Sequence, residues 1–251
     1  MRLLKVCKGK IKSVTVKRVA SGKLYASILT EDKDKKPDVK IDIKKTVGID
    51  MSMKDFAVTS DGERANYPRY YRKSEKKLST LQRKLARKVK GSNNRHKAKM
   101  KLARLHEKVT NQREDFLHRA SKQLIERYDV IGLEDINLQA MSKGLRLGKP
   151  VYDNGFGKFR EMLAYKAERC GKILVKIDKW FASTRLCSNC GYQNKEIKNL
   201  GVRSWGCPAC GTLHDRDINA AMNIGKKAIE QTTLATRGSD ASGEGQSNTT
   251  Y

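Results

Sequence analysis

The sequence predicts an α/β fold in which helices cover a mixed sheet. Two short apolar runs, at 47–50 and 129–134, each end in an acid, and a third apolar run follows at 173–177. Between the second and third runs, apolar residues recur at helical spacing from Phe159 to Ala167. The order strand, helix, strand is typical of a sheet with a helix packed against it.

A β-hairpin is expected before this sheet, at residues 9–30. β-branched and aromatic residues alternate there with polar ones around a turn at 20–22, and the charged residues 31–40 indicate a linker. After the first sheet strand the apolar pattern resumes at 56–59, and a third short strand is expected to end at Tyr67. These strands fit sequential antiparallel pairing.

Amphipathic helices are predicted from Arg69 to Arg127, because leucines and valines recur there at helical spacing, with a break at 91–94. One last helix is expected over 217–229. The Gly, Ser and Thr-rich residues 232–251 are expected to form a disordered tail.

The charge balance indicates a polyanionic partner. The 251 residues include 54 Lys and Arg against 27 Asp and Glu, a net charge of +27, while 38% hydrophobic residues suffice for a core. No stretch approaches the about 18 to 20 apolar residues of a membrane helix, and the N-terminus lacks a secretory apolar region. We therefore expect a cytoplasmic, nucleoid-associated protein without a membrane partner or a small-molecule substrate.

The basic helices are the predicted nucleic-acid surface. A solvated helix face normally interleaves both signs of charge, whereas one sign dominates here, which favours contacts with phosphates. The tyrosines at 67, 70 and 71 either stack on bases or anchor the nearby turn. The predicted contact residues are Lys73, Lys76, Lys77, Arg83, Lys84, Arg87, Lys88 and Arg95.

Four of the six cysteines form two C-x-x-C pairs, each followed by a glycine, which predicts one tetrahedral zinc site. A closed four-thiolate site has no open position, so the zinc is expected to be structural. His214 is surplus to this ligand set. The aromatic residues that flank the zinc site are expected to be packing residues, namely Trp180, Phe181 and Trp205. The predicted ligands are Cys187, Cys190, Cys207 and Cys210.

Three acids are candidate catalytic residues. Asp50 and Glu134 end predicted strands, and Asp217 opens the last helix. Each alone fits an ordinary strand end or helix cap, but together they fit Mg²⁺ or Mn²⁺, because crowded carboxylates without a cation repel one another. Beside a basic surface, they suggest phosphodiester hydrolysis with two metal ions.

Several stretches resemble the TnpB (OrfB) family of transposon-encoded proteins, relatives of the type V CRISPR effector nucleases. They are VGIDMSMKDFAVTSDG, NQREDFLHRASKQLI, VIGLEDINLQAM and the run FASTRLCSNCG to WGCPACGTLHDRDINAAMNI. The resemblance implies an RNase H-like (RuvC-type) nuclease interrupted by a zinc ribbon, which cuts target DNA under the direction of an RNA from the transposon end. By the family pattern Asp50, Glu134 and Asp217 are catalytic, and Asp215 is the less suitable neighbour.

The resemblance also implies a domain organisation. Family members usually carry a helical recognition lobe and the first part of a wedge domain upstream, whereas this chain starts near the predicted hairpin. The expected parts are a partial wedge-like β segment (1–44), the first part of the nuclease domain (45–183), the zinc ribbon (184–213), the last nuclease motif and helix (214–231) and the tail (232–251).

Two other functions fit the same residues. One is a truncated or nuclease-idle nucleic-acid-binding remnant or regulator, which three intact acids disfavour. The other is a strand-transfer transposase, because water and a 3′-hydroxyl attack by the same two-metal route.

Overall fold

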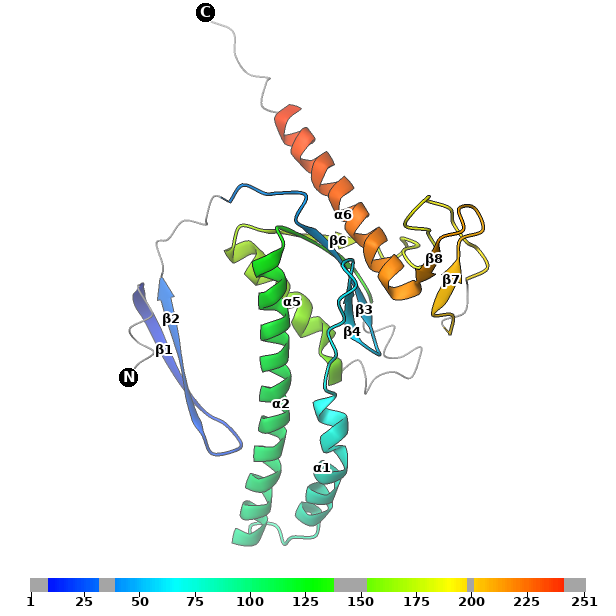
Figure 1. Cartoon of the computed structure of the whole chain (residues 1–251). Coiled ribbons are helices and arrows are strands. Elements are labelled where there is room, and N and C mark those ends of the chain that lie inside the picture. Colours follow the sequence, from blue (N-terminus) through cyan, green and yellow to red (C-terminus); the bar gives the residue numbers. More distant parts are fainter. Residues whose placement is uncertain (1–8, 32–38, 138–152, 198–200, 242–251) are drawn as a thin grey trace, which may run out of the picture. The chain divides into compact units, whose positions relative to one another are not determined.

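The computed structural model describes residues 9–31, 39–137, 153–197 and 201–241 (Figure 1). The chain divides into two compact units. The first joins the N-terminal hairpin to Arg69–Asp115, and the second joins Asp38–Pro68 to Phe116–Tyr251. Within the described ranges, no helix is long and apolar enough to cross a membrane.

The first unit contains the predicted hairpin and basic helices. Strands β1 (Lys10–Arg18) and β2 (Leu24–Glu31) pair antiparallel, as expected. Helix α1 (Tyr70–Ala86) is followed by α2 (Asn93–Arg127), so the helical region breaks where the sequence predicts. The Glu107 carboxylate accepts hydrogen bonds from the side chains of Lys23 and Tyr25, which links the hairpin to α2.

The second unit is built on a mixed four-stranded sheet of order β4-β3-β5-β6. Strands β3 (Thr46–Ser52), β5 (Val130–Glu134) and β6 (Ile173–Ile177) are parallel, and β4 (Phe56–Thr59) is antiparallel to β3. Helix α5 (Phe156–Arg169) connects β5 to β6. The three predicted apolar strands and the helix between the last two are therefore confirmed.

The turn between β3 and β4 is held by aromatic packing. Phe56 adopts a left-handed backbone with a φ of 66°, which is unfavourable for a bulky residue. Its buried ring contacts the rings of Tyr67 and Phe116, with centroids 5.9 and 5.3 Å away. Tyr67 is therefore an anchor rather than a base-stacking residue. The prediction of a third short strand is wrong, since a single β-bridge between Val58 and Arg64 takes its place.

Helix α6 (Arg216–Ala241) covers one face of the sheet. Helix α5 and the part of α2 that follows Phe116 cover the opposite face (Figure 1). The helix continues well past the predicted end. The expectation of a disordered tail from residue 232 is therefore wrong for 232–241, and residues 242–251 lie outside the described ranges.

Two glycines let α6 approach the sheet at backbone distance. A Cβ atom on Gly48 of β3 would lie 1.9 Å from the Ala221 carbonyl oxygen and 2.3 Å from the Gly225 nitrogen. A Cβ on Gly132 of β5 would lie 2.8 Å from the Cβ of Ala228. Because real contacts are never this short, any larger residue must push the helix away from the strands.

We predict that Gly48→Ala lowers the free energy of unfolding by about 3 kcal/mol or more, because the added methyl group meets backbone rather than a flexible side chain. Urea unfolding measures the change. The control is Gly206→Ala, whose Cβ would meet only the Leu213 side chain, at 3.4 Å. We expect the control to stay within about 1 kcal/mol of the parent, and equal stability of both variants would contradict close packing.

Candidate metal centre and carboxylate site

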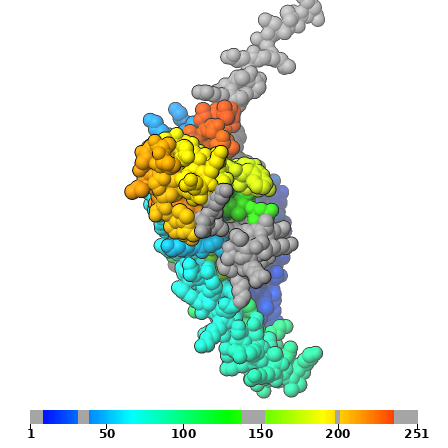
Figure 2. All heavy atoms as spheres, turned by 90° about the vertical axis from the view of Figure 1, so that its right-hand side faces the viewer, coloured from blue at the N-terminus to red at the C-terminus, as the bar shows by residue number. Residues whose placement is uncertain are grey.

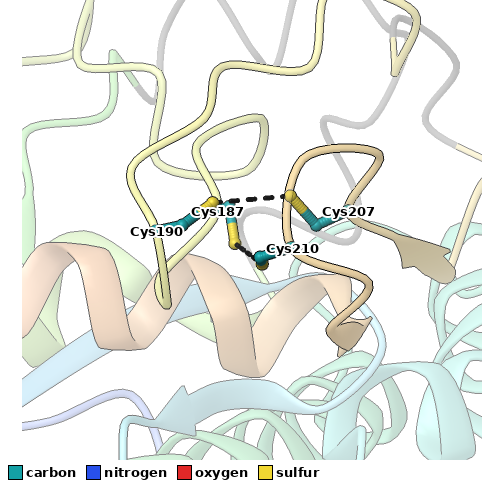
Figure 3. A group of neighbouring side chains, drawn as sticks. All are labelled: Cys187, Cys190, Cys207 and Cys210. Carbon is teal, nitrogen blue, oxygen red and sulfur yellow. Dashed lines mark hydrogen bonds between the residues drawn. The ribbon is translucent and has the colours of Figure 1, made fainter.

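The four predicted cysteines come together at one point. The sulfur atoms of Cys187, Cys190, Cys207 and Cys210 all lie within 4.8 Å of one another, and Figure 3 shows them converging from two facing loops. The sulfur atoms of Cys187 and Cys210 are 3.7 Å apart, and those of Cys190 and Cys207 are 3.6 Å apart. A tetrahedron with zinc–sulfur bonds of about 2.3 Å has edges of about 3.8 Å, so the group fits zinc.

The two loops repeat one hydrogen-bonding pattern. The Gly191 N–H donates to the Cys187 carbonyl at 2.9 Å, and the Gly211 N–H donates to the Cys207 carbonyl at 2.8 Å. Both glycines have positive φ, 79° and 71°, which disfavours any residue with a side chain. The glycine after each C-x-x-C pair is thus required by the turn that points both sulfurs inward.

Side chains around the sulfurs support the same site. The Nε2 atom of His214 lies 3.0 Å from the Cys187 sulfur, and the Thr212 hydroxyl lies 3.2 Å from the Cys210 sulfur. Trp205 is buried, with its ring 4.7 Å from the His214 ring. His214 therefore contacts a ligand instead of completing the ligand set, and Trp205 packs as expected.

The sheet register brings two of the candidate acids together. In the parallel pair of β3 and β5, Ile49 is the partner of Leu133, and Asp50 and Glu134 each follow that pair by one residue. Since side chains alternate along strands, both acids point to the sheet face toward which a Cβ atom on Gly48 would point. This face is covered by α6.

Helix α6 brings the third acid near Asp50, whose pKa its charge helps to raise. Asp217 lies one turn before Ala221, whose carbonyl contacts Gly48, so it shares the sheet-facing side of the helix. Its side chain is 13% exposed. Asp215 has another role, because its carboxylate accepts the backbone N–H groups of Asp217 and Ile218 at 3.1 and 3.0 Å and so caps the helix.

The other two carboxylates act electrostatically on Asp50. Burial, together with the negative charges of Asp217 and Glu134, raises the pKa of Asp50 to about 7. Burial likewise raises the pKa of Glu134 to about 7. A divalent cation bound to these oxygen atoms would offset the repulsion, and carboxylates are the donors that Mg²⁺ and Mn²⁺ prefer, so these residues fit such an ion.

Two arginines lie beside the acids without having been singled out from the sequence. Arg64 is 2.8 Å from the Asp215 carboxylate and 3.8 Å from that of Asp217, while Arg203 is 3.7 Å from Asp217. Arg64 also pairs with Asp55 at 2.5 Å. An arginine after a turn carries no pattern of its own, so only the fold reveals this arrangement.

Two buried asparagines of α6 hold the cysteine segment, residues 184–213, to the helix. Asn219 accepts the Ser188 N–H at 2.9 Å and donates to the Leu186 carbonyl at 2.8 Å. Asn223 donates to the carbonyls of Ser183 and Leu186 at 2.8 and 2.6 Å. Sequence reasoning missed both roles, although the four-residue spacing on one helix face was a usable signal.

Figure 2 shows the cysteine segment and the start of α6 as one continuous yellow and orange mass. Asp217, on the sheet-facing side of the helix, and Asn219, on the side that holds the cysteine segment, both lie in the first turn of α6. Folding of the cysteine segment and placement of Asp217 are therefore linked through one helix.

The predicted nucleic-acid residues lie in the first unit, on α1, on the turn that follows it and, for Arg95, at the start of α2. Seven of the eight are exposed. Arg95 is the exception, because its guanidinium donates to the carbonyls of Leu85 and Lys88 at 3.1 and 3.0 Å and closes the turn between the helices. Contact of all eight with nucleic acid remains a prediction.

Two family models match the chain. Residues 27–144 match the OrfB_IS605 model, described as a probable transposase, and residues 156–224 match the Cas12f1-like TNB domain. A protein of Streptomyces pristinaespiralis, provisionally named an RNA-guided DNA endonuclease, is 38% identical over 212 residues, covering 84% of this chain and 52% of that protein.

The chain belongs to the TnpB/OrfB family. Another relative, Escherichia coli InsQ, also provisionally named an RNA-guided DNA endonuclease, is 33% identical over 86% of this chain and 56% of its own length. The chain thus spans about half the length of these curated relatives.

The fold agrees with this membership. A solved Cas12f1–sgRNA–target DNA complex matches with a TM-score of 0.51 and 19% identity, covering 84% of this chain and 55% of the solved chain. The RNase H-like (RuvC-type) mixed sheet that the TnpB/OrfB resemblance implies is therefore confirmed as the fold class.

We predict that Cys187→Ser abolishes zinc binding, because three thiolates and a hydroxyl bind the ion far more weakly than four thiolates. Elemental analysis of protein purified without chelator measures the zinc. Cys170→Ser is the control, because this exposed cysteine lies outside the four-cysteine group. Parent protein without zinc, or equal zinc in both variants, would refute the site.

Proposed function

We propose that this chain is the nuclease part of a DNA endonuclease directed by RNA, which hydrolyses phosphodiester bonds with Mg²⁺ or Mn²⁺. The proposal rests on the approach of Asp217, at the start of α6, to Asp50 and Glu134 at the ends of adjacent strands. The TnpB/OrfB membership supports it, as do the relatives provisionally named RNA-guided DNA endonucleases. Target DNA and a guide RNA from the transposon end are the proposed partners.

Each carboxylate has a defined part in this reaction. Asp50 and Glu134 would hold the cations from adjacent parallel strands, and Asp217 would complete the oxygen ligands from the helix. A bound pair of divalent ions supplies two effects, a lower pKa for the attacking water and stabilisation of the leaving 3′ oxygen. The chain itself orients the scissile phosphate and keeps the oxygen ligands fixed.

Arg64 and Arg203 place positive charge beside the carboxylates. Both guanidinium groups lie within 4 Å of the Asp217 carboxylate, where they offset part of its negative charge. Both guanidinium groups would also be placed to bind the phosphate of the substrate strand, because guanidinium matches phosphate geometry.

We predict that Asp50→Asn lowers DNA cleavage by about a thousandfold or more while nucleic-acid affinity stays near that of the parent, because a neutral amide no longer holds the cations. Glu134→Gln and Asp217→Asn should behave alike. Plasmid cleavage with co-expressed RNA and Mg²⁺ measures the rate, and Ca²⁺ should support binding without cutting.

The control is Asp215→Asn, since asparagine still caps a helix. We expect the control to cut within a few fold of the parent. Normal cutting by Asp217→Asn beside an inactive Asp215→Asn would reverse the assignment of these two acids. Parent-like cutting by all three carboxylate variants would remove the two-metal proposal.

The basic surface generates a second prediction. Changing Lys84, Arg87 and Lys88 to Glu should reduce the slope of log affinity against log salt concentration by about three, since each phosphate contact with DNA contributes about 0.9. Binding should weaken on all sequences alike. Filter binding at several salt concentrations measures the slope.

Lys122→Glu is the comparison, because Lys122 is an exposed lysine in the second unit, where it pairs with Glu126. This variant should leave the slope within the error of the parent. A triple variant whose affinity and slope match the parent would show that α1 and its following turn do not contact phosphates.

A further inference from the structure

One exposed tryptophan remains unexplained by packing. The side chain of Trp180 is 82% exposed, more than any other exposed aromatic side chain in the described part of the chain, whereas Trp205 is 8% exposed. The expectation that Trp180 packs beside the cysteines is therefore wrong. Tryptophan is enriched at binding interfaces, because its large ring supplies contact area, so an indole held outward beside a cation is a candidate contact.

The backbone around Trp180 is fixed on both sides. Its N–H donates to the Asp178 carboxylate at 2.7 Å, and the Phe181 N–H donates to the Asp178 carbonyl at 3.0 Å. Phe181 packs against the core cluster that contains Ile177 and Ile224. The turn therefore packs one ring against the core and presents the neighbouring ring to solvent, which is a preorganised arrangement.

This turn lies at the edge of the sheet that carries the acids. Ile177, the last residue of β6, is the register partner of Glu134 and packs with Ile224 on the α6 face. Trp180 follows only three residues later, so its Cα lies within about 11 Å of that of Ile177. The Lys179 ammonium lies 5.2 Å from the centroid of the Trp180 ring, within cation–π range.

We propose that Trp180 stacks on an unpaired base of the single-stranded DNA that reaches the carboxylates, with Lys179 meeting the adjacent phosphate. The inference rests on the proposed function and adds a substrate contact to the same site. Exposed aromatic rings paired with a cation are the recurring means of holding single strands, because every base offers a face to stack on. Bases in a duplex are already stacked, so an unpaired strand is the expected ligand.

Fluorescence tests the contact without any cleavage. The chain has two tryptophans, so in Trp205→Phe the indole of Trp180 is the sole reporter. Titration with a dT12 oligonucleotide in Ca²⁺ should quench this emission, while an oligonucleotide of the same length made of abasic residues, with the same phosphates, should quench it little. The matched variant Trp180→Phe, in which Trp205 remains, should show no quenching and covers the case in which Trp205→Phe fails to fold.

Affinity gives a second readout. Trp180→Ala should weaken dT12 binding about tenfold and Trp180→Phe less than threefold, since stacking needs a ring rather than an indole. Equal quenching by the dT12 and abasic strands, or unchanged affinity of Trp180→Ala, would overturn the inference. If that happens while the parent still cuts DNA, the proposed function stands without this contact. Base-dependent quenching in a parent that never cuts would instead overturn the proposed function.

Discussion

The contact between α6 and the two glycines of the sheet is the constraint on which the site depends. A helix normally rests on the side chains of the strands beneath it, but Gly48 and Gly132 admit its backbone and a small alanine side chain directly. This closeness places the first turn of α6 beside the ends of β3 and β5. Three carboxylates from distant parts of the sequence then lie near one another. Burial raises the pKa values of Asp50 and Glu134 there, and the charges of Asp217 and Glu134 add to the shift of Asp50.

The same helix gives the run from Asp217 to Ile224 a physical meaning. One side carries Asp217, Ala221 and Ile224 toward the sheet, and another carries Asn219 and Asn223 toward the cysteine segment. Small residues are needed where the helix meets strands, and amides are needed where it meets unpaired backbone groups. The cysteine segment therefore supports the carboxylate site through the helix, although no cysteine needs to touch the substrate.

Much of this arrangement follows from local pattern. The apolar strands, the break between the basic helices and the paired cysteines each have a short-range signal, and the structure contains all of them. The end of α6 was misjudged because its polar residues after 231 resemble a tail, yet they continue a helix already nucleated on the sheet. The roles of Gly48, Arg64 and Asn219 depend on contacts between residues far apart in the sequence, which periodicity does not reveal.

Cation binding by the folded chain tests most directly whether the convergence of the acids makes a metal site. Titration with Mn²⁺, followed by the loss of the EPR signal of the free ion, counts the bound ions without requiring RNA, DNA or cleavage. We expect two ions per chain in the parent and loss of these sites in Asp50→Asn, with zinc content and unfolding temperature maintained. Equal Mn²⁺ binding by the parent and Asp50→Asn, or no binding by a folded parent, would contradict a metal site built by α6 on the glycines of the sheet.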